Sequence, residues 1–285
     1  MVNQFNNDTK SVHLFSGVEI PCIGFGTSQI ANNQIEDALL CACREGYRHI
    51  DTADAYGNEE SIGKAIHSIG IPREELFITS KLRNRYRGYK TTIEAFERTL
   101  ERMELDYLDL FLIHWPANRK KFENWDEINQ ETWKAMTEIY KSGKVRAIGV
   151  SNFLPKHLKS LMETEIPPMV NQIEYHPGWR PTEITDFCHG HNIIVEGWSP
   201  LGNGKVLHEP TLIDLAKKYG RTPGQICIRW CLQNGVLPLP KSVTPSRIAE
   251  NIQVFDFEIS REDMNRINDL EVMGWSGLNP DEVEF

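Results

Sequence analysis

Long hydrophobic runs are absent from this chain of 285 residues. No apolar stretch approaches the ~20 residues that span a bilayer, so we expect no membrane-spanning segment and no membrane partner. The amino-terminal string MVNQFNNDTK has no apolar core of the kind found in secretory signals. We therefore expect a cytoplasmic protein.

Basic residues are too few to suggest a nucleic-acid surface. The sequence has 31 Lys and Arg residues against 40 Asp and Glu residues, and its formal net charge is −9. Nucleic-acid binding depends on a concentrated stripe of Lys and Arg, so we expect no nucleic-acid partner. The acidic balance does not exclude an anionic cofactor, because such a ligand needs only a local basic cluster.

The cysteine and glycine motifs of common metal and cofactor sites are also missing. No GxGxxG follows a predicted strand, which argues against a Rossmann domain. Residues 202–205, GNGK, lack the rest of a P-loop and are interpreted as a plain turn. We expect reduced, mostly buried thiols and no metal site, because no CxxC pair occurs among Cys22, Cys41, Cys43, Cys188, Cys227 and Cys231.

What the chain does contain is a regular alternation of apolar, strand-like runs and helical segments. Helical periodicity is clearest over residues 92–103, 131–141 and 212–219. Several of the strand-like runs are continuously apolar, as parallel strands buried on both faces should be. No linker or repeat interrupts the alternation, so the sequence predicts one α/β domain over residues 1–285, a (β/α)8 TIM barrel. Its strands are predicted at residues 23–26, 47–50, 76–81, 108–114, 145–150, 169–173, 193–198 and 236–240.

The two ends of the chain carry additions to this alternation. Residues 11–20, SVHLFSGVEI, predict a β-hairpin with a turn at Ser16 and Gly17, where glycine accepts a positive φ. Residues 273–285 are irregular and polar. We expect them to form an active-site loop over the barrel mouth, with a segment that trails away as the alternative.

Four polar residues follow the apolar runs of three successive predicted strands. They are Asp51, Tyr56, Lys81 and His114, and the intervals from Asp51 to Lys81 and on to His114 are 30 and 33 residues. That spacing is about one strand, one helix and two short loops. Because a parallel barrel gathers its strand ends at one mouth, we expect one shared site. Each residue alone has an ordinary structural explanation, but four together favour catalysis.

The chemistry that these four residues permit is the protonation of a carbonyl group. A tyrosine phenol has a reference pKa near 10, and a nearby ammonium group lowers it by stabilising the phenolate. Asp51 would keep Lys81 charged and in place. His114 would donate a hydrogen bond to the substrate oxygen. Such a set delivers a proton to a carbonyl oxygen while another group supplies hydride to the carbon.

Eight characteristic motifs occur in order along nearly the whole chain: GFGTS, DTADAYGNEE, ITSKL, LFLIHWP, VRAIGVSNF, VNQIEYHP, EGWSPL and LPKSVTPSRIAEN. In them the chain resembles the aldo-keto reductases, and its ending GLNPDEVEF is similar to the short-tailed microbial reductases of diketogluconate and methylglyoxal. The resemblance implies NADPH-dependent reduction of aldehydes or ketones. It implies that Tyr56 donates the proton, that Lys81 and Asp51 tune its pKa, and that His114 orients the substrate.

The cofactor contacts are expected along the same strand ends. Short amide and hydroxyl groups after two strands suit a carboxamide, which both donates and accepts hydrogen bonds, and Trp198 offers a flat face for stacking. A helix predicted to begin at Pro245 with Thr244 as its N-cap suits an anion, and the cations beside it favour NADPH over NADH. Together with the resemblance, this predicts a cofactor site of Gly26, Thr27, Asp51, Ser151, Asn152, Gln172, Trp198, Ser199, Leu201, Lys241, Ser242, Val243, Arg247, Glu250 and Asn251.

The chain departs from the family at two positions that commonly carry tryptophan, where it has Ser28 and Arg83. A wider or more polar pocket is expected, with substrate contacts from these two residues and from Tyr56, His114 and Trp115. Basic residues after two strands prompt the hypothesis that anionic carbonyl compounds are preferred. These are Arg83, Arg85, Arg87, Arg119, Lys120 and Lys121.

Two other functions remain as alternatives to a reductase. The first is a non-catalytic NADPH-binding sensor or regulatory subunit, which the intact set of four residues disfavours. The second is a Schiff-base aldolase that uses Lys81, which requires a neutral lysine and is opposed by the neighbouring Asp51. For the reductase we expect a monomer with a small-molecule carbonyl substrate.

Overall fold

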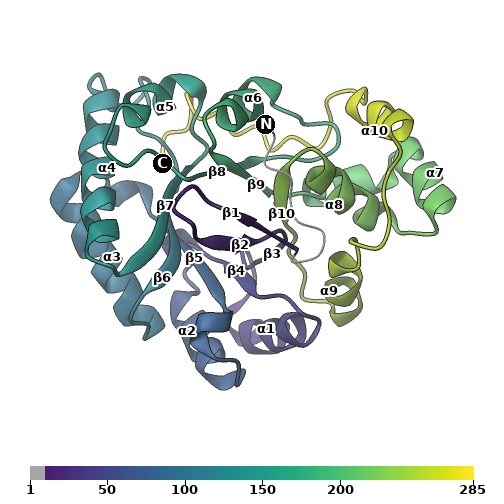
Figure 1. Ribbon diagram of the computed structural model, residues 1–285, viewed down its shortest axis with the longest axis horizontal. Coiled ribbons are helices and arrows are strands. Elements are labelled where there is room, and N and C mark those ends of the chain that lie inside the picture. Colours follow the sequence, from purple (N-terminus) through teal and green to yellow (C-terminus); the bar gives the residue numbers. More distant parts are fainter. Residues whose placement is uncertain (1–9) are drawn as a thin grey trace.

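The computed structural model describes residues 10–285 as a ring of parallel strands surrounded by helices (Figure 1). The ring contains eight strands in chain order from β3 to β10. The backbone N–H of Gly26 donates to the carbonyl oxygen of Pro240 at 3.0 Å, and this bond joins the two ends of the ring. The predicted (β/α)8 barrel is confirmed, with strands β3 (Gly24–Gly26), β4 (His49–Asp51), β5 (Phe77–Leu82), β6 (Leu108–Ile113), β7 (Val145–Ser151), β8 (Val170–Glu174), β9 (Ile194–Trp198) and β10 (Val236–Leu239).

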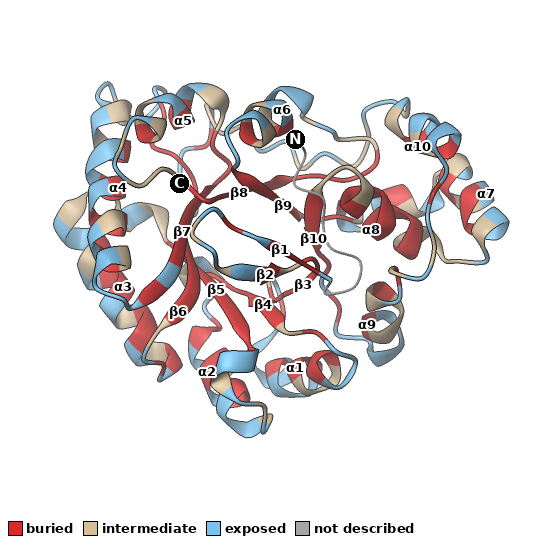
Figure 2. Cartoon of the chain, in the orientation of Figure 1, coloured by how far each residue is buried: buried red, intermediate tan, exposed pale blue. Residues whose placement is uncertain are grey.

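Helices form the outer layer, and their buried residues face the interior of the molecule (Figure 2). In α3 the buried side chains recur every three or four residues, from Thr92 through Phe96 to Met103, which is the spacing of one helix face. The strands are buried along almost their whole length. The helices are α1 (Ile35–Arg44), α2 (Glu59–Ser68), α3 (Tyr89–Met103), α4 (Trp125–Lys141), α5 (Pro155–Met162), α6 (Thr182–Gly190), α7 (Pro210–Tyr219), α8 (Pro223–Gln233), α9 (Pro245–Ile252) and α10 (Arg261–Asn268).

The predicted strand boundaries agree with the observed ones to within two residues. The predicted starts of two long helices, α3 and α4, come too late. α4 begins at Trp125 rather than at residue 131. Its first turns are mostly polar, and they carry Asn129, whose side chain accepts from the Ala117 N–H at 2.8 Å and donates to the Ala117 carbonyl at 3.1 Å. A buried polar residue of this kind interrupts the apolar period from which the helix start was predicted.

The amino-terminal hairpin consists of β1 (Ser11–His13) and β2 (Glu19–Pro21), paired antiparallel. Its turn contains Gly17 at φ +84°, so the predicted hairpin is confirmed. The hairpin lies across the ring of strands in Figure 1, and the chain leads from it directly into β3, so it covers the amino-terminal end of the barrel. The amino-terminal string, which we expect not to be a secretory signal, lies largely in residues 1–9 and therefore outside the described residues.

The carboxyl-terminal segment covers the opposite end, as expected for an active-site loop. Ser276 donates to the Glu174 carboxylate from its N–H at 2.9 Å and from its hydroxyl at 2.6 Å. Asn118 donates to the carbonyl oxygen of Val283 at 2.9 Å. The ring of Phe285 packs edge-on against Trp115 with centroids 5.3 Å apart. These contacts decide between the two expectations, because the segment is held against the barrel mouth.

Within residues 10–285, no helix combines the length and apolar character needed to cross a membrane. All six cysteines are unpaired thiols, five of them buried and Cys41 half-buried. In the same part of the chain, no three His, Cys, Asp or Glu side chains cluster closely enough to hold a metal ion.

Candidate active site

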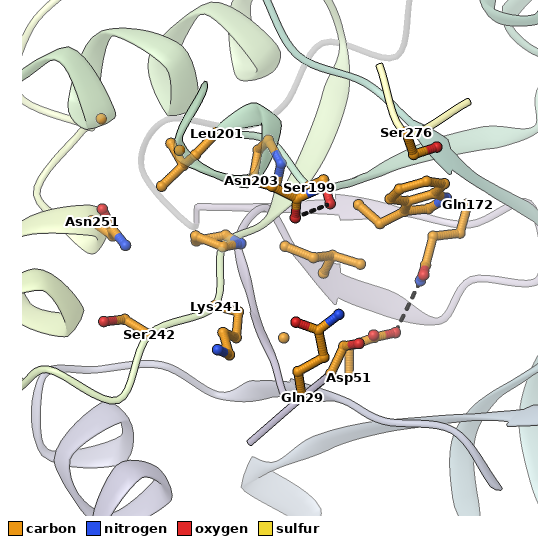
Figure 3. Close-up of a pocket in the computed structure, with 18 of the residues that line it drawn as sticks. Gln29, Asp51, Gln172, Ser199, Leu201, Asn203, Lys241, Ser242, Asn251 and Ser276 are labelled. Atoms are coloured by element: carbon orange, nitrogen blue, oxygen red, sulfur yellow. Dashed lines mark hydrogen bonds between the residues drawn. The ribbon is translucent and has the colours of Figure 1, made fainter. Parts of the chain in front are cut away.

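A cavity of about 920 Å³ opens at the carboxyl ends of the barrel strands (Figure 3). The last residues of β3, β4, β7, β9 and β10 all line it. Three of the four predicted catalytic residues, Asp51, Tyr56 and His114, form part of its wall. Lys81 lies directly behind them with its side chain fully buried.

Lys81 connects the acid and the phenol of the predicted catalytic set. Its Nζ lies 2.7 Å from Oδ1 of Asp51, 2.9 Å from the Thr52 carbonyl oxygen and 3.4 Å from Oη of Tyr56. These three acceptors match the three hydrogens of an ammonium group. Asp51 ends β4 and Lys81 lies inside β5, so both sit within strands rather than just past them as the sequence suggested.

Lys81 is charged in this setting. Burial acts to lower its pKa, but the charges of Asp51 and Tyr56 and the hydrogen bonds to them outweigh burial and raise it. A charged ammonium group is not a nucleophile. The arrangement therefore gives no support to the Schiff-base aldolase alternative.

Tyr56 keeps its proton at neutral pH. Burial raises the pKa of its phenol, and the Lys81 ammonium lowers it, but burial has the larger effect and the net pKa is raised. Lys81 thus lowers the pKa of Tyr56, as predicted, but burial decides the direction of the net pKa shift. A protonated phenol is the state that a proton donor requires.

His114 faces Tyr56 across the cavity wall. Their ring centroids lie 5.7 Å apart at an interplanar angle of 78°. Burial lowers the pKa of His114 to about 3, and the charges of Lys81 and Arg87 act in the same direction. The imidazole is therefore neutral at ordinary pH and offers one N–H donor and one acceptor.

The residues predicted to contact the nicotinamide lie together at the ends of β7 and β9 and in the middle of β8. The Ser151 hydroxyl donates to the Gln172 carbonyl at 2.8 Å. The indole N–H of Trp198 donates to Oδ1 of Asn152 at 2.9 Å. Asn152 also donates to the carbonyl oxygen of His114 at 3.0 Å, which connects this group to the predicted catalytic set. Hydroxyl, amide and indole groups thus converge on one side of the cavity.

The far end of the cavity is built from the start of α9. Lys241 and Ser242 lie just before the helix, Arg247 in its first turn and Asn251 in its last turn, and all four line the cavity (Figure 3). Thr244 is the N-cap residue by position, but its side chain caps no N–H. With Pro245 at the first helical position, backbone N–H groups of this turn have no side-chain cap and carry the positive end of the helix dipole.

Three of the predicted contact residues do not line the cavity. Thr27 is fully buried and donates to the Asp51 carbonyl at 2.9 Å, while Val243 is 38% exposed and Arg83 is half-buried outside the cavity wall. The structure brings the other predicted residues to the wall: Gly26, Asp51, Ser151, Asn152, Gln172, Trp198, Ser199, Leu201, Lys241, Ser242, Arg247, Glu250, Asn251, Ser28, Tyr56, His114 and Trp115.

Several wall residues were not anticipated from the sequence. Asn203 belongs to the GNGK segment, which was interpreted as a plain turn, and its side chain accepts from the Ser199 hydroxyl at 3.3 Å (Figure 3). The φ of +54° at Asn203 is a signal that only the structure provides. The others include Gln29, Thr222, Gly224, Ser276, Leu278 and Phe285.

Three of the basic residues near the barrel mouth, Arg87, Lys120 and Lys121, bind groups of neighbouring loops and of the carboxyl-terminal segment. Lys120 pairs with the Glu284 carboxylate at 2.7 Å, and Lys121 donates to the Glu284 carbonyl at 2.6 Å. Arg87 donates to the carbonyl oxygens of Trp115 and Pro116 at 3.2 and 2.9 Å. Within residues 10–285, none of the six basic residues considered for anion steering lines the cavity.

A sequence model described as the aldo/keto reductase family matches residues 22–272. Among curated proteins, glyoxal reductase of Bacillus subtilis (strain 168) is 47% identical over 277 residues, covering 96% of this chain and 98% of that protein. Methylglyoxal reductase DkgA of Escherichia coli (strain K12) is 42% identical over 274 residues, covering 95% of this chain and 97% of that protein.

Solved structures of similar proteins have the same fold. An aldo-keto reductase from a Medee basin deep-sea metagenome library, MGS-M4, superposes with a TM-score of 0.91 at 42% identity and covers 96% of this chain and 100% of its own. A mutant of the protein Gox0644 in complex with NADPH superposes with a TM-score of 0.89 at 39% identity, over 96% of this chain and 98% of its own.

Proposed function

Because this chain belongs to the aldo/keto reductase family and is therefore an oxidoreductase, we propose that it reduces small aldehydes and ketones with NADPH. The observation that carries the proposal is the Lys81 ammonium, which contacts Asp51 and Tyr56 at the wall of the same cavity as His114. The names of the glyoxal and methylglyoxal reductases support a dicarbonyl substrate. The described barrel would act as one domain.

The residues of the cavity fit NADPH. Ser151, Asn152 and Gln172 supply hydroxyl and amide groups for the nicotinamide carboxamide, and Trp198 supplies a face for its ring. At the other end, Lys241 and the uncapped first turn of α9 would hold the 2′-phosphate, together with Arg247 and Ser242. When bound, the cofactor supplies hydride to the carbonyl carbon.

The protein's own residues handle the proton. In the proposal, Tyr56 donates from Oη to the substrate oxygen, and the neutral His114 donates a hydrogen bond that fixes the direction of that oxygen. The Lys81 ammonium, 3.4 Å from Oη, stabilises the phenolate as it forms. Asp51 holds Lys81 charged and in place at 2.7 Å.

Loss of reduced-nicotinamide absorbance tests the proposal, with glyoxal, methylglyoxal and a panel of longer aldehydes and ketones as substrates. NADPH and NADH are compared for the wild type and for Tyr56→Phe, which keeps the ring and removes the proton. We expect turnover with NADPH and a loss of roughly 10²- to 10⁴-fold in the variant. Tight NADPH binding by a wild type that reduces no carbonyl would favour the sensor alternative.

A further inference from the structure

A buried carboxyl group, Glu196, lies inside the barrel next to the residues proposed for catalysis. It belongs to β9, two residues before Trp198, and its side chain is fully buried. Burial raises its pKa to about 8, and the charge of Asp51 acts in the same direction. Glu196 is therefore a neutral acid over most of the physiological range.

Gln172 connects this acid to the catalytic set. Its amide nitrogen donates to Oδ2 of Asp51 at 2.9 Å (Figure 3). The same nitrogen donates to Oε2 of Glu196 at 2.8 Å. An amide nitrogen has two hydrogens, so both are used by the two carboxyl groups. The Gln172 side-chain amide cannot flip without the loss of these two buried hydrogen bonds. The amide oxygen is therefore fixed on the side away from the two carboxyl groups.

The remaining surroundings of Glu196 allow it to stay protonated. Its Oε1 has no hydrogen-bond partner among the described residues and lies 3.8 Å from Nε2 of His49, which also contacts the Thr79 hydroxyl at 2.9 Å. Because Oε2 accepts from Gln172, the carboxyl proton belongs on Oε1. The titratable groups that face it are His49 and Asp51 on β4 and Lys81 on β5, whereas β8 contributes the uncharged Gln172 and β10 is apolar.

We infer that Glu196 is a positioning residue which, as a neutral acid, fixes Gln172 and through it the Asp51–Lys81 pair. The inference rests on the proposed function and adds a requirement to it. An ionised Glu196 would place a second negative charge beside Asp51. That charge would hold protons more tightly on Lys81 and Tyr56, and it would slow proton donation to the substrate.

Two variants separate the parts of this role. Glu196→Gln cannot ionise but keeps an oxygen that accepts from Gln172, whereas Glu196→Leu keeps the approximate volume and leaves one Gln172 hydrogen without an acceptor. Glu174→Gln is the matched control, because Glu174 is a buried carboxyl group of the neighbouring strand that binds Ser276 and not Gln172.

The first measurement uses the protein without cofactor or substrate, as urea unfolding from pH 5 to 8. A raised folded pKa favours the fold below the unfolded value of 4.5, and this stabilisation is lost as pH rises towards about 8. The wild type should therefore become less stable relative to Glu196→Gln across this window. The same decline should persist in Glu174→Gln. A constant difference between wild type and Glu196→Gln would overturn the neutral-acid assignment.

The second measurement is the pH profile of kcat together with the Kd for NADPH. We expect a decline near pH 8 in the wild type that is absent from Glu196→Gln. Glu196→Gln should keep its rate at neutral pH within about threefold, while Glu196→Leu loses roughly tenfold or more and binds NADPH more weakly. Identical profiles, or a fully active Glu196→Leu, would overturn the inference. A wild type without activity would refute the proposed function, and the unfolding profiles and NADPH affinities would still decide the role of Glu196.

Discussion

Replacement of Lys81 by methionine would remove the charge that joins Asp51 to Tyr56. At 3.4 Å and an effective dielectric constant of about 20, an ammonium–phenolate attraction is worth at most about 5 kcal/mol. Because each 1.36 kcal/mol is a factor of ten in rate, the proton-transfer step should slow by up to roughly 4 × 10³-fold. The variant should bind NADPH nearly as well as the wild type, since Lys81 does not line the cavity.

The same substitution should also destabilise the fold. Asp51 is 4% exposed and would lose a buried partner at 2.7 Å, and removal of one member of such a pair typically costs about 3–5 kcal/mol. The hydrogen bond that Asp51 accepts from Gln172 offsets part of this cost. We therefore expect the free energy of unfolding in urea to fall by roughly 3 kcal/mol at neutral pH.

A double variant distinguishes lost stability from lost chemistry. Asp51→Asn combined with Lys81→Met contains neither charge, so it should be more stable than Lys81→Met alone. It should be no more active, because the phenolate still lacks its cation. Recovery of the rate together with stability, or a rate for Lys81→Met within about tenfold of the wild type, would refute the assignment of Lys81 to phenolate stabilisation.

Three further outcomes are expected. Because the pKa of His114 is lowered to about 3, the imidazole stays neutral and kcat/KM should show no titration of this residue between pH 5 and 7. His114→Ala should reduce kcat/KM roughly 10²-fold. An inflection near pH 6.5 that disappears in His114→Ala would contradict the neutral state. Ser28→Trp should narrow the cavity and reduce kcat/KM for long aldehydes by roughly tenfold while glyoxal is little affected, as a comparison of the two substrates will test. Phe285→Ala removes an apolar wall beside Trp115, so KM for apolar aldehydes should rise with kcat unchanged, and an equal loss in kcat would indicate a different role.

The barrel and the gathering of the four polar residues at its mouth could be predicted from the sequence because both leave a local signal. Buried parallel strands are nearly continuous apolar runs, and a polar residue at the end of such a run is conspicuous. That signal identified Asp51 and His114 as members of one site, and chain order alone placed their strands near each other. The starts of α3 and α4 escaped because their first turns are fixed by tertiary contacts of polar residues, as with Asn129 and Ala117.

Other parts of the site depend on contacts between distant segments. Phe285 and Ser276 reach the cavity only because the tail is fastened to Asn118 and Glu174, more than 100 residues earlier in the chain. Glu196 did leave a signal, since it is the one charged residue in the apolar run IIVEGW and stands two positions before Trp198 on the same face of its strand. The signal did not reveal its partner, because Gln172 lies on another strand.

The distribution of charge along the cavity argues against the anionic substrate that the sequence suggested. The cations on the wall, Lys241 and Arg247, lie at the α9 end, where they suit a phosphate. Near Tyr56 the charged wall residue is Asp51, an acid that pairs with Lys81. Ser28, Trp115, Leu278 and Phe285 add uncharged side chains to the wall.

We therefore expect an uncharged aldehyde to be reduced at least as well as its carboxylated counterpart, as measured by kcat/KM for a matched pair such as benzaldehyde and carboxybenzaldehyde. Arg83 lies outside the cavity wall, so Arg83→Ala should leave that ratio unchanged. A clear preference for the acid that disappears in Arg83→Ala would restore the anionic hypothesis, because Arg83 would then have to reach the substrate by a movement of its loop.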